Sequence, residues 1–291
     1  MLFRQLELDT TRLYETGDYR SALQRLDAES GNFPELGHRC KIAFLRACLL
    51  ARAGAPDAAL DVLDAATEEG LWWAESMLAD HDLDSCRGER LDRITRHAEL
   101  SPDAPSCFVH EGLPGAGVLL ALHGGSECVS GRDNPWAAAA DAGWTVYRPV
   151  SSQRRGAGLA TWTDLDVAVE ECRTHLARIG TVDAIGAFSL GASLALRLIT
   201  EVVNVPALMV APSLRPLVVE RAVPKVTGAV IDIIIGEHDP FLNLASRGVD
   251  QLRAAGARLR IEIVPDVAHH FPPDFEQHLT DRLDNHLRRP S

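Results

Sequence analysis

A serine ends an apolar run in the segment AFSLGAS, residues 187–193 of the chain. The run VDAIGAF leads into Ser189, and the apolar spacing of SLALRLIT, which comes shortly after it, predicts a helix. A serine hydroxyl is a poor nucleophile at neutral pH until a neighbouring base removes its proton. Ser189 is therefore either a polar residue between a strand and a helix or a nucleophile held on a sharp turn.

Residues that could assist such a serine follow three other apolar runs. A histidine can take the proton, a carboxylate can orient that histidine, and backbone N–H groups can stabilise an oxyanion. The run GVLLALH ends in His123-Gly124-Gly125, AVIDIIIG is followed by Glu237-His238-Asp239, and LRIEIVP is followed by a segment that contains His269-His270. The chain thus holds each group that a serine nucleophile needs.

The elements around these residues alternate between short apolar runs and helical patterns. The predicted strands are GVLLALH, WTVYRPV, VDAIGAF, PALMVAP, AVIDIIIG and LRIEIVP, with helices in NPWAAAADAG, LDVAVEECRTHLARIG, SLALRLITEVV and LASRGVDQLRAAG. Continuous apolar strands separated by helices predict an α/β architecture, a mostly parallel sheet with helices on both faces. Such sheets bind ligands at the carboxyl ends of their strands, so the polar residues should meet there. Residues 213–228, between PALMVAP and AVIDIIIG, are too few for a helical lid.

Four motifs at these strand ends, in the order serine, acid, histidine, make residues 107–288 resemble the α/β-hydrolase superfamily, in particular its bacterial carboxylesterase and peptidase-like branches. The resemblance implies that Ser189 is a nucleophile exposed on a strand-turn-helix elbow. The elbow usually has glycine two residues before and two residues after the serine. Gly191 matches this pattern, and Ala187 replaces the first glycine.

The resemblance also implies the two partners of the serine. The stretch HHFPPDF resembles the family's His-x-Phe-Pro sequence, which makes His269 the general base and His270 its main rival. Asp239, in GEHDPF, matches the acid that holds the base in one tautomer and stabilises its cation. Glu237 and His238 do not match the family position, and we interpret them as solvated loop residues.

Two backbone N–H groups are expected to form the oxyanion hole. One belongs to Leu190 at the start of the helix, and the other to Gly125, since glycine lets the backbone approach an oxygen closely. A simple turn at Gly124-Gly125 is the alternative. The loop RPVSSQRRGAGLATWTD resembles an SSQ…W pattern of a bacterial subgroup of these hydrolases, and a plain long loop fits it equally well. The candidate substrate-binding residues are Gly124, Ser152, Gln153 and Phe188.

The sequence predicts two domains, a helical one at residues 1–100 and the catalytic one at 107–291, joined by the segment ELSPDAPSC. In the first, LYETGDYRSALQRLDA resembles LLARAGAPDAALDVLDAA, and Gly17 recurs as Gly54, 37 residues later. That offset is close to the roughly 34-residue tetratricopeptide repeat. An unrelated helical cap is the alternative. Two repeats bury their apolar faces poorly, so the helices should pack near the catalytic entrance through Trp72 and Trp73, or bind a protein partner.

Composition and charge exclude several classes of protein. The 291 residues are 46% apolar and 24% charged, as in soluble globular proteins. The net charge of −12 argues against a nucleic-acid partner. MLFRQLELDT lacks the features of a signal peptide and no stretch is apolar enough to span a membrane, so a cytoplasmic location is expected. The six cysteines show no ligand spacing, and His269-His270 have no histidine four residues on, so we expect neither a metal nor a cofactor.

These residues predict a serine hydrolase that cleaves a carboxylic ester or thioester of a small molecule through an acyl-enzyme. Amide or peptide hydrolysis by the same fold is one alternative, and an idle hydrolase-like scaffold that binds a partner through its helices is another. No charged specificity pocket is visible in the sequence, which favours esters over peptides. The presence of all three residues, Ser189, Asp239 and His269, argues against an idle scaffold.

Overall fold

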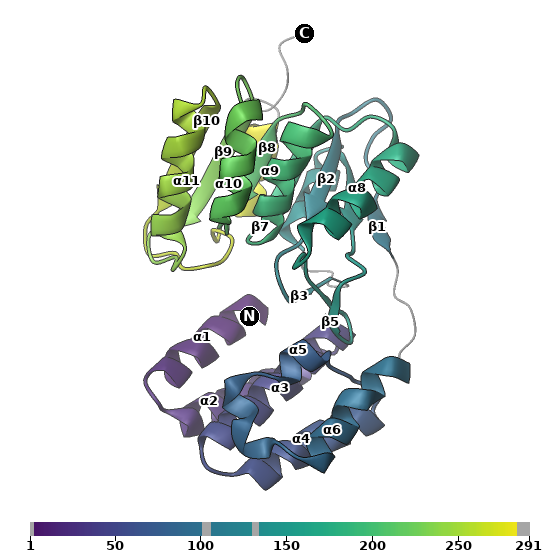
Figure 1. The fold of residues 1–291 in the computed structure, drawn as a ribbon, viewed down its shortest axis with the longest axis vertical. Coiled ribbons are helices and arrows are strands. Elements are labelled where there is room, and N and C mark those ends of the chain that lie inside the picture. The colour runs from purple at the N-terminus through teal and green to yellow at the C-terminus, as the bar shows by residue number, and fades with distance from the viewer. Residues whose placement is uncertain (1–2, 101–105, 130–133, 284–291) are drawn as a thin grey trace. The chain divides into compact units, whose positions relative to one another are not determined.

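The computed structural model describes residues 3–100, 106–129 and 134–283. The chain forms two compact units (Figure 1). Unit 1 comprises Met1–Ala104, Ser126–Arg132 and Arg154–Ala160, and unit 2 comprises Pro105–Gly125, Asp133–Gln153 and Thr161–Ser291. The domain ranges 1–100 and 107–291 stay a prediction, and the compact units differ from them because two segments beyond residue 107 join the helices. Residues 101–105 of the predicted linker lie outside the described residues.

Unit 2 is built on a mostly parallel sheet, as the sequence predicts. Within the described residues its seven strands lie in the order β1-β4-β2-β7-β8-β9-β10, and β1 alone is antiparallel to its neighbour. The strands are β1 (Cys107–His110), β4 (Thr145–Pro149), β2 (Val118–Leu122), β7 (Ala184–Phe188), β8 (Ala207–Val210), β9 (Val230–Gly236) and β10 (Arg258–Val264). The sequence did not predict β1, in which Val109 is exposed and the other three residues are only half-buried.

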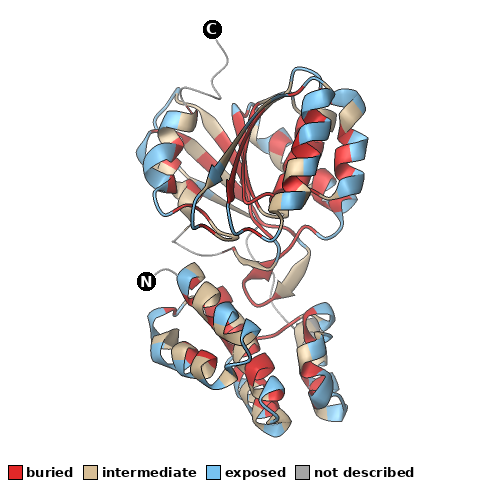
Figure 2. Ribbon diagram, turned by 90° about the vertical axis from the view of Figure 1, so that its left-hand side faces the viewer, coloured by how far each residue is buried: buried red, intermediate tan, exposed pale blue. Residues whose placement is uncertain are grey.

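Alternate residues of each central strand face opposite sides of the sheet, as the two-residue period of a strand requires. Leu120 and Ile185 pack into a core with one set of helices. Leu119 and Ala184 pack into a second core on the other face. Figure 2 shows buried residues concentrated along these strands. Both faces are therefore covered, and this explains why the strands are apolar throughout rather than alternating.

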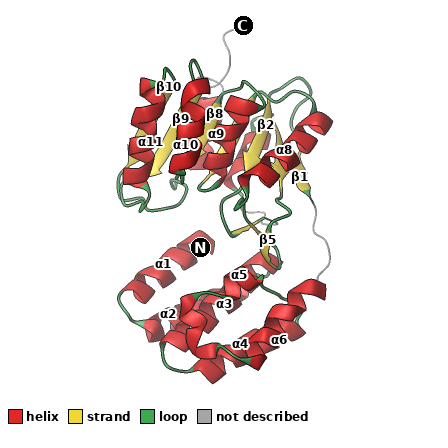
Figure 3. Cartoon of the chain, viewed as in Figure 1, coloured by secondary structure: helices red, strands yellow, loops and turns green. Residues whose placement is uncertain are grey.

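Helices cover both faces of the sheet (Figure 3). One face carries α8 (Leu165–Ile179), α9 (Gly191–Glu201), α10 (Pro216–Ala222) and α11 (Leu242–Ala254), and the other carries the turn η4 (Pro135–Ala137) with α7 (Ala138–Asp141) and α12 (Phe275–Arg282). Within residues 213–228, α10 packs on α9 and α11 and buries Val218, Val219 and Ala222 in the core. This segment therefore contributes a helix to the layer over the sheet.

Unit 1 contains two helical hairpins with the glycine turns expected from the sequence. The helices are α1 (Phe3–Glu15), α2 (Tyr19–Glu29), α3 (Leu36–Arg52) and α4 (Pro56–Glu68), followed by α5 (Glu75–Leu78), η2 (His81–Cys86), α6 (Glu89–Arg96) and η3 (His97–Leu100); η1 (Ser30–Asn32) follows α2. Gly17 and Gly54 occupy equivalent turns with φ of 77° and 84°. Ala22 and Ala59, five residues after each glycine, are fully buried. The two segments thus share one local structure as well as their sequence pattern.

Two segments that follow β2 and β4 complete unit 1. They form a small sheet of β3 (Glu127–Cys128), β6 (Leu159–Ala160) and β5 (Arg154–Gly156). Trp73 forms a β-bridge with Gly156, and the backbone N–H of Ala157 donates to the carbonyl of Trp72 over 2.9 Å. Both tryptophans are buried in one core that contains the helices of unit 1 together with Ala157 and Leu159 of these segments. These short strands give no periodic signal in the sequence, so they were not predicted.

No helix among the described residues is both long enough and apolar enough to cross a membrane. Four of the six cysteines are buried, and Cys107 and Cys128 are half-buried.

The turn between α3 and α4 can be tested with two glycine variants. Gly54→Ala places a methyl group in open space but at a φ of +84°, whereas Gly31→Ala places one in open space without a positive φ. We expect Gly54→Ala to lower the free energy of unfolding by about 1 kcal/mol, because L residues are strained in left-handed backbone, and Gly31→Ala to change it by less than about 0.5 kcal/mol. Urea unfolding followed by circular dichroism measures both. Equal effects would refute the strained turn.

Candidate active site

Ser189 lies between β7 and α9 in a strained backbone conformation. Its φ is 51°, a left-handed value that is uncommon for residues other than glycine. The Ser189 N–H donates to the Val210 carbonyl over 3.0 Å, and its own carbonyl accepts from Ser213 and Ala192, each over 3.0 Å. Neighbouring backbone on β8 and α9 therefore holds the turn in place. This is the sharp strand-turn-helix elbow expected from the sequence.

Gly191 allows the first turn of α9 to approach the end of β2. A Cβ at this position would lie 2.6 Å from the carbonyl oxygen of His123 and 2.9 Å from that of Leu122. Backbone oxygens cannot move aside cheaply, so only glycine fits. Ala187 is paired with Leu122 and Met209 in the sheet and is fully buried. Its methyl group is therefore accommodated where the usual elbow has glycine.

Ser189, His269 and Asp239 form a hydrogen-bonded chain. The Ser189 Oγ lies 2.8 Å from His269 Nε2, and His269 Nδ1 lies 2.9 Å from Asp239 Oδ2. The Asp239 side chain is fully buried, and its other oxygen accepts from the Phe241 N–H over 2.8 Å. A carboxylate can only accept, so Nδ1 carries the proton and Nε2 is left to accept the serine proton. The geometry is that of a nucleophile, a base and an orienting acid.

The loop that carries His269 is pinned to the end of β9. A Cβ on Gly236 would lie 2.1 Å from the Val267 carbonyl oxygen, so glycine is required for this approach. His238 N–H donates to the same carbonyl over 2.9 Å. Since Asp239 follows directly in the chain, these contacts bring the acid beside the histidine. The two polar segments, thirty residues apart, thus meet at one edge of the sheet.

The other residues of these two segments face different partners. His270 Nδ1 lies 2.7 Å from the Phe271 carbonyl, and Glu237 accepts from the Asp266 N–H over 3.4 Å. Glu237 and His238 are exposed, in agreement with their interpretation as solvated loop residues. The structure therefore brings His269, and not His270, into hydrogen-bond distance of the serine.

The two expected oxyanion donors lie next to each other. A Cβ built on Gly125 would be 3.8 Å from Leu190 Cβ and 3.5 Å from its Cδ2. Gly125 is exposed, and Leu190 is half-buried at the start of α9. Both backbone segments thus border the same space beside Ser189. Their N–H groups as an oxyanion hole stay a prediction.

His123 and Trp162 support the loop that carries Gly125, and sequence reasoning gave them no such role. The Trp162 Nε1–H donates to the His123 carbonyl over 2.8 Å, and the two rings stack at 4.4 Å. His123 Nδ1 lies 2.7 Å from the Gly124 carbonyl, and Nε2 accepts from the Ser151 N–H over 3.3 Å. The ring is therefore neutral with its proton on Nδ1. The available sequence signal was the tryptophan in the loop after β4, which the structure buries fully.

The candidate substrate-binding residues have different surroundings. Ser152 is exposed and its hydroxyl contacts the Glu171 carboxylate on α8. The Gln153 amide exchanges two hydrogen bonds with the backbone of Asp164, at 2.8 and 2.7 Å. Gly124 is buried beside His123. These contacts hold the loop together, and direct contact of Gly124, Ser152 and Gln153 with a substrate stays a prediction.

Aromatic side chains lie beside His269, the candidate general base. Phe241 meets the His269 ring edge-on at 5.0 Å, and Phe188 lies 5.5 Å from it. Phe188 also stacks on Phe271 at 4.7 Å and is 7% exposed. These contacts restrict the orientation of the imidazole ring. Phe188 therefore supports the site from within the core, and its contact with a substrate stays a prediction.

Comparison with known proteins identifies the fold. No protein-family profile matches the chain, and no curated protein matches it in sequence. An uncharacterized protein from Bacillus cereus ATCC 10987 is similar over 98% of this chain and 99% of its own, with a TM-score of 0.54 and 21% identity. Esterase PE8 is similar over 62% of this chain and 99% of its own, with a TM-score of 0.54 and 15% identity. With the sheet order and its two helical layers, this shows the α/β-hydrolase fold.

The strain at Ser189 yields a test that is independent of activity. Ser189→Ala keeps a side chain at a φ of 51°, whereas Ser189→Gly relieves the strain. We expect the free energy of unfolding of Ser189→Gly to be about 1 kcal/mol higher than that of Ser189→Ala. Urea unfolding of the two variants side by side gives the difference. A more stable alanine variant would contradict the strained elbow.

Proposed function

We propose that the protein is a serine hydrolase that cleaves a carboxylic ester or thioester through an acyl-enzyme. The single observation that carries the proposal is the hydrogen-bonded chain from Ser189 through His269 to the buried Asp239. The similarity to esterase PE8 supports the fold that such a site requires. We also propose that the substrate is a small molecule.

The first half of the reaction forms the acyl-enzyme. Ser189 Oγ attacks the carbonyl carbon of the substrate while His269 Nε2 takes its proton. Negative charge then develops on the carbonyl oxygen, where the N–H groups of Leu190 and Gly125 are proposed to donate; each such donor is worth about 10²–10³-fold in rate. The tetrahedral intermediate collapses, the bond to the leaving group breaks, and Nε2 returns its proton to that group. Asp239 stabilises the imidazolium throughout.

The second half releases the acid. Water attacks the acyl carbonyl, His269 Nε2 takes one proton from it, and the same proton returns to Ser189 Oγ as the ester bond to the enzyme breaks. The reaction consumes one water for each ester cleaved and needs only the groups that the chain itself supplies. Amide hydrolysis would use the same steps with an amine leaving group. Parallel assays on p-nitrophenyl esters, acyl thioesters and p-nitroanilides separate these activities.

Ser189→Ala is the direct test of the proposed nucleophile. Removing the hydroxyl leaves only binding and the oxyanion hole, so we expect hydrolysis to fall by about 10⁶-fold and labelling by a fluorophosphonate probe to disappear. Ser246→Ala, which removes a half-buried hydroxyl from α11, is the matched control and should keep both. Labelling or turnover that persists in Ser189→Ala would refute the serine mechanism.

The adjacent histidines supply a second test. His269→Ala removes the proton acceptor at 2.8 Å from Ser189 Oγ, whereas the His270 ring lies 2.7 Å from the Phe271 carbonyl. We expect kcat/KM to fall by about 10⁴-fold or more in His269→Ala and by less than about tenfold in His270→Ala. Steady-state kinetics on one p-nitrophenyl ester compares them. The reverse order of the two losses would reassign the base to His270.

A further inference from the structure

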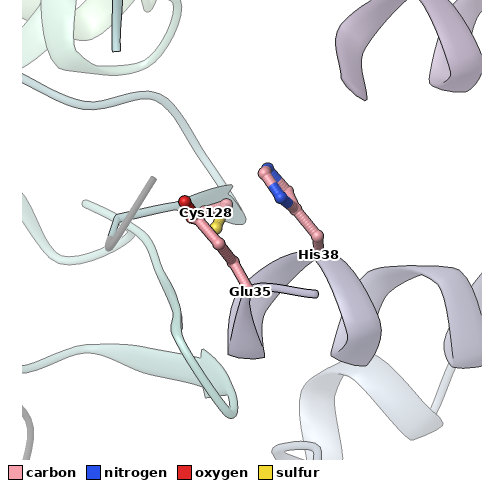
Figure 4. A group of neighbouring side chains, drawn as sticks. All are labelled: Glu35, His38 and Cys128. Atoms are coloured by element: carbon pink, nitrogen blue, oxygen red, sulfur yellow. The ribbon is translucent and has the colours of Figure 1, made fainter. Parts of the chain in front are cut away.

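Glu35, His38 and Cys128 meet within unit 1, outside the proposed catalytic chain. One carboxylate, imidazole or thiol atom from each lies within 4.8 Å of those of the other two. Figure 4 shows Glu35 and His38 extending from the beginning of α3 on the side where Cys128 of β3 lies. Carboxylate oxygen, imidazole nitrogen and thiolate sulfur are the protein ligands that zinc binds. The cluster therefore has the chemistry of a transition-metal site.

The helix supplies two of these groups at a suitable spacing. Glu35 is the residue that precedes α3, with extended backbone at φ −64° and ψ 144°, and His38 follows three residues later in the first turn. Residues three apart at the start of a helix lie on one side of it. Their side chains therefore reach the same point in space. The spacing Glu-x-x-His is short enough to be set by the helix alone.

Two glycines bring the cysteine onto the first turn of α3. A Cβ on Gly37 would lie 2.5 Å from the Cys128 sulfur and 2.8 Å from the Gly158 carbonyl oxygen. A Cβ on Gly158, whose φ is 70°, would lie 2.7 Å from the Gly37 nitrogen. Any side chain at either position would push the paired strands β3 and β6 away from the helix. The close approach places the sulfur beside Glu35 and His38.

Aromatic packing holds the imidazole in place. The His38 ring is 6% exposed, stacks on Phe3 at 4.1 Å and meets the edge of Phe33 at 5.7 Å. A metal binds to a ring nitrogen in the plane of the imidazole, so stacking on its face does not obstruct binding. An apolar shell around a ligand also limits exchange with water. His38 is thus oriented by packing before any ion arrives.

We propose that Glu35, His38 and Cys128 bind one divalent transition-metal ion of the Zn²⁺ or Co²⁺ type, with water as the fourth ligand. Tetrahedral ligands at about 2.0–2.3 Å from zinc lie about 3.5 Å apart, so side-chain movements of about 1 Å close the site. The ion joins the start of α3 to a strand ninety positions further along the chain. Binding of an ion by the folded state alone stabilises that state.

The sequence shows no metal-ligand spacing and therefore predicts no metal. Cys128 is distant in the sequence from the other two residues of this cluster, and only the fold brings residues 35 and 38 to residue 128. Other groups of this kind in the described residues are chemically different. Asp80-His81-Asp82 and the exposed cluster of Glu237, His238 and Asp266 contain no thiol. A thiolate-specific signal therefore reports on Cys128.

The test is a Co²⁺ titration of the full-length protein after chelator treatment, in a buffer with a non-thiol reductant. We expect a thiolate-to-cobalt charge-transfer absorption in the near ultraviolet that saturates at one equivalent and is lost when Zn²⁺ displaces the cobalt. Cys128→Ser should abolish this absorption. Cys107→Ser, which alters the other half-buried cysteine, is the matched control and should keep it. Circular dichroism verifies that each variant is folded.

Two conservative variants test the remaining ligands. We expect His38→Gln and Glu35→Gln each to weaken Co²⁺ binding by about 10–100-fold or more, since even residues that only support a ligand have effects of this size. Glu35 is half-buried, so Glu35→Gln decides the outcome if a variant at a more buried position fails to fold. Co²⁺ binding without the absorption, an absorption that Cys128→Ser retains, or unchanged affinity in Glu35→Gln would overturn the proposal.

Discussion

The close approach of the start of α9 to the end of β2 is the constraint on which the proposed catalytic site depends. Gly191 permits it, because a Cβ there would collide with two backbone oxygens of β2 and the residue that follows it. Ser189, two residues earlier, has left-handed backbone, and its hydroxyl lies within hydrogen-bond distance of His269. The approach also brings Leu190 beside Gly125. One contact between backbone segments thus positions both the nucleophile and the proposed oxyanion donors.

A second backbone contact brings in the base and the acid. The approach of Gly236 to Val267 pins the loop after β10 to the end of β9, and His269 then reaches both Asp239 and Ser189. The aromatic rings of Phe188 and Phe241 complete the support. The geometry of the proposed catalytic site therefore depends on strand ends and glycines. Side chains with no chemistry of their own, such as Trp162, maintain it through hydrogen bonds to the loop backbone.

Local patterns in the sequence were enough to predict most of unit 2. Its central strands are buried on both faces and so appear as uninterrupted apolar runs, and polar residues mark their ends. Parallel strands end at one edge of a sheet, so these polar residues were expected to meet there, and the resemblance to the α/β-hydrolases selected Ser189, Asp239 and His269 among them. The tight turns at Gly17 and Gly54 were equally visible, since left-handed backbone favours glycine.

Features that depend on contacts between distant segments escaped prediction. The strands β3, β5 and β6 are two or three residues long, and their pairing with the helical segment is visible only in the fold. Helix α10 has seven residues and no clear periodic signal. The grouping of Glu35 with Cys128 depends on two glycines that permit backbone contact. Sequence spacing alone carries no information about such pairs.

The central claim is that Ser189, activated by His269 and Asp239, carries the acyl group during hydrolysis. The most direct measurement is intact-protein mass spectrometry of the enzyme quenched in acid during turnover of a p-nitrophenyl ester, followed by peptide mapping. The account predicts a mass increase of one acyl group, located on the peptide that contains Ser189, and faster accumulation of this species than its decay. An acyl group found on another residue, or turnover with no covalent species at any time, would contradict it.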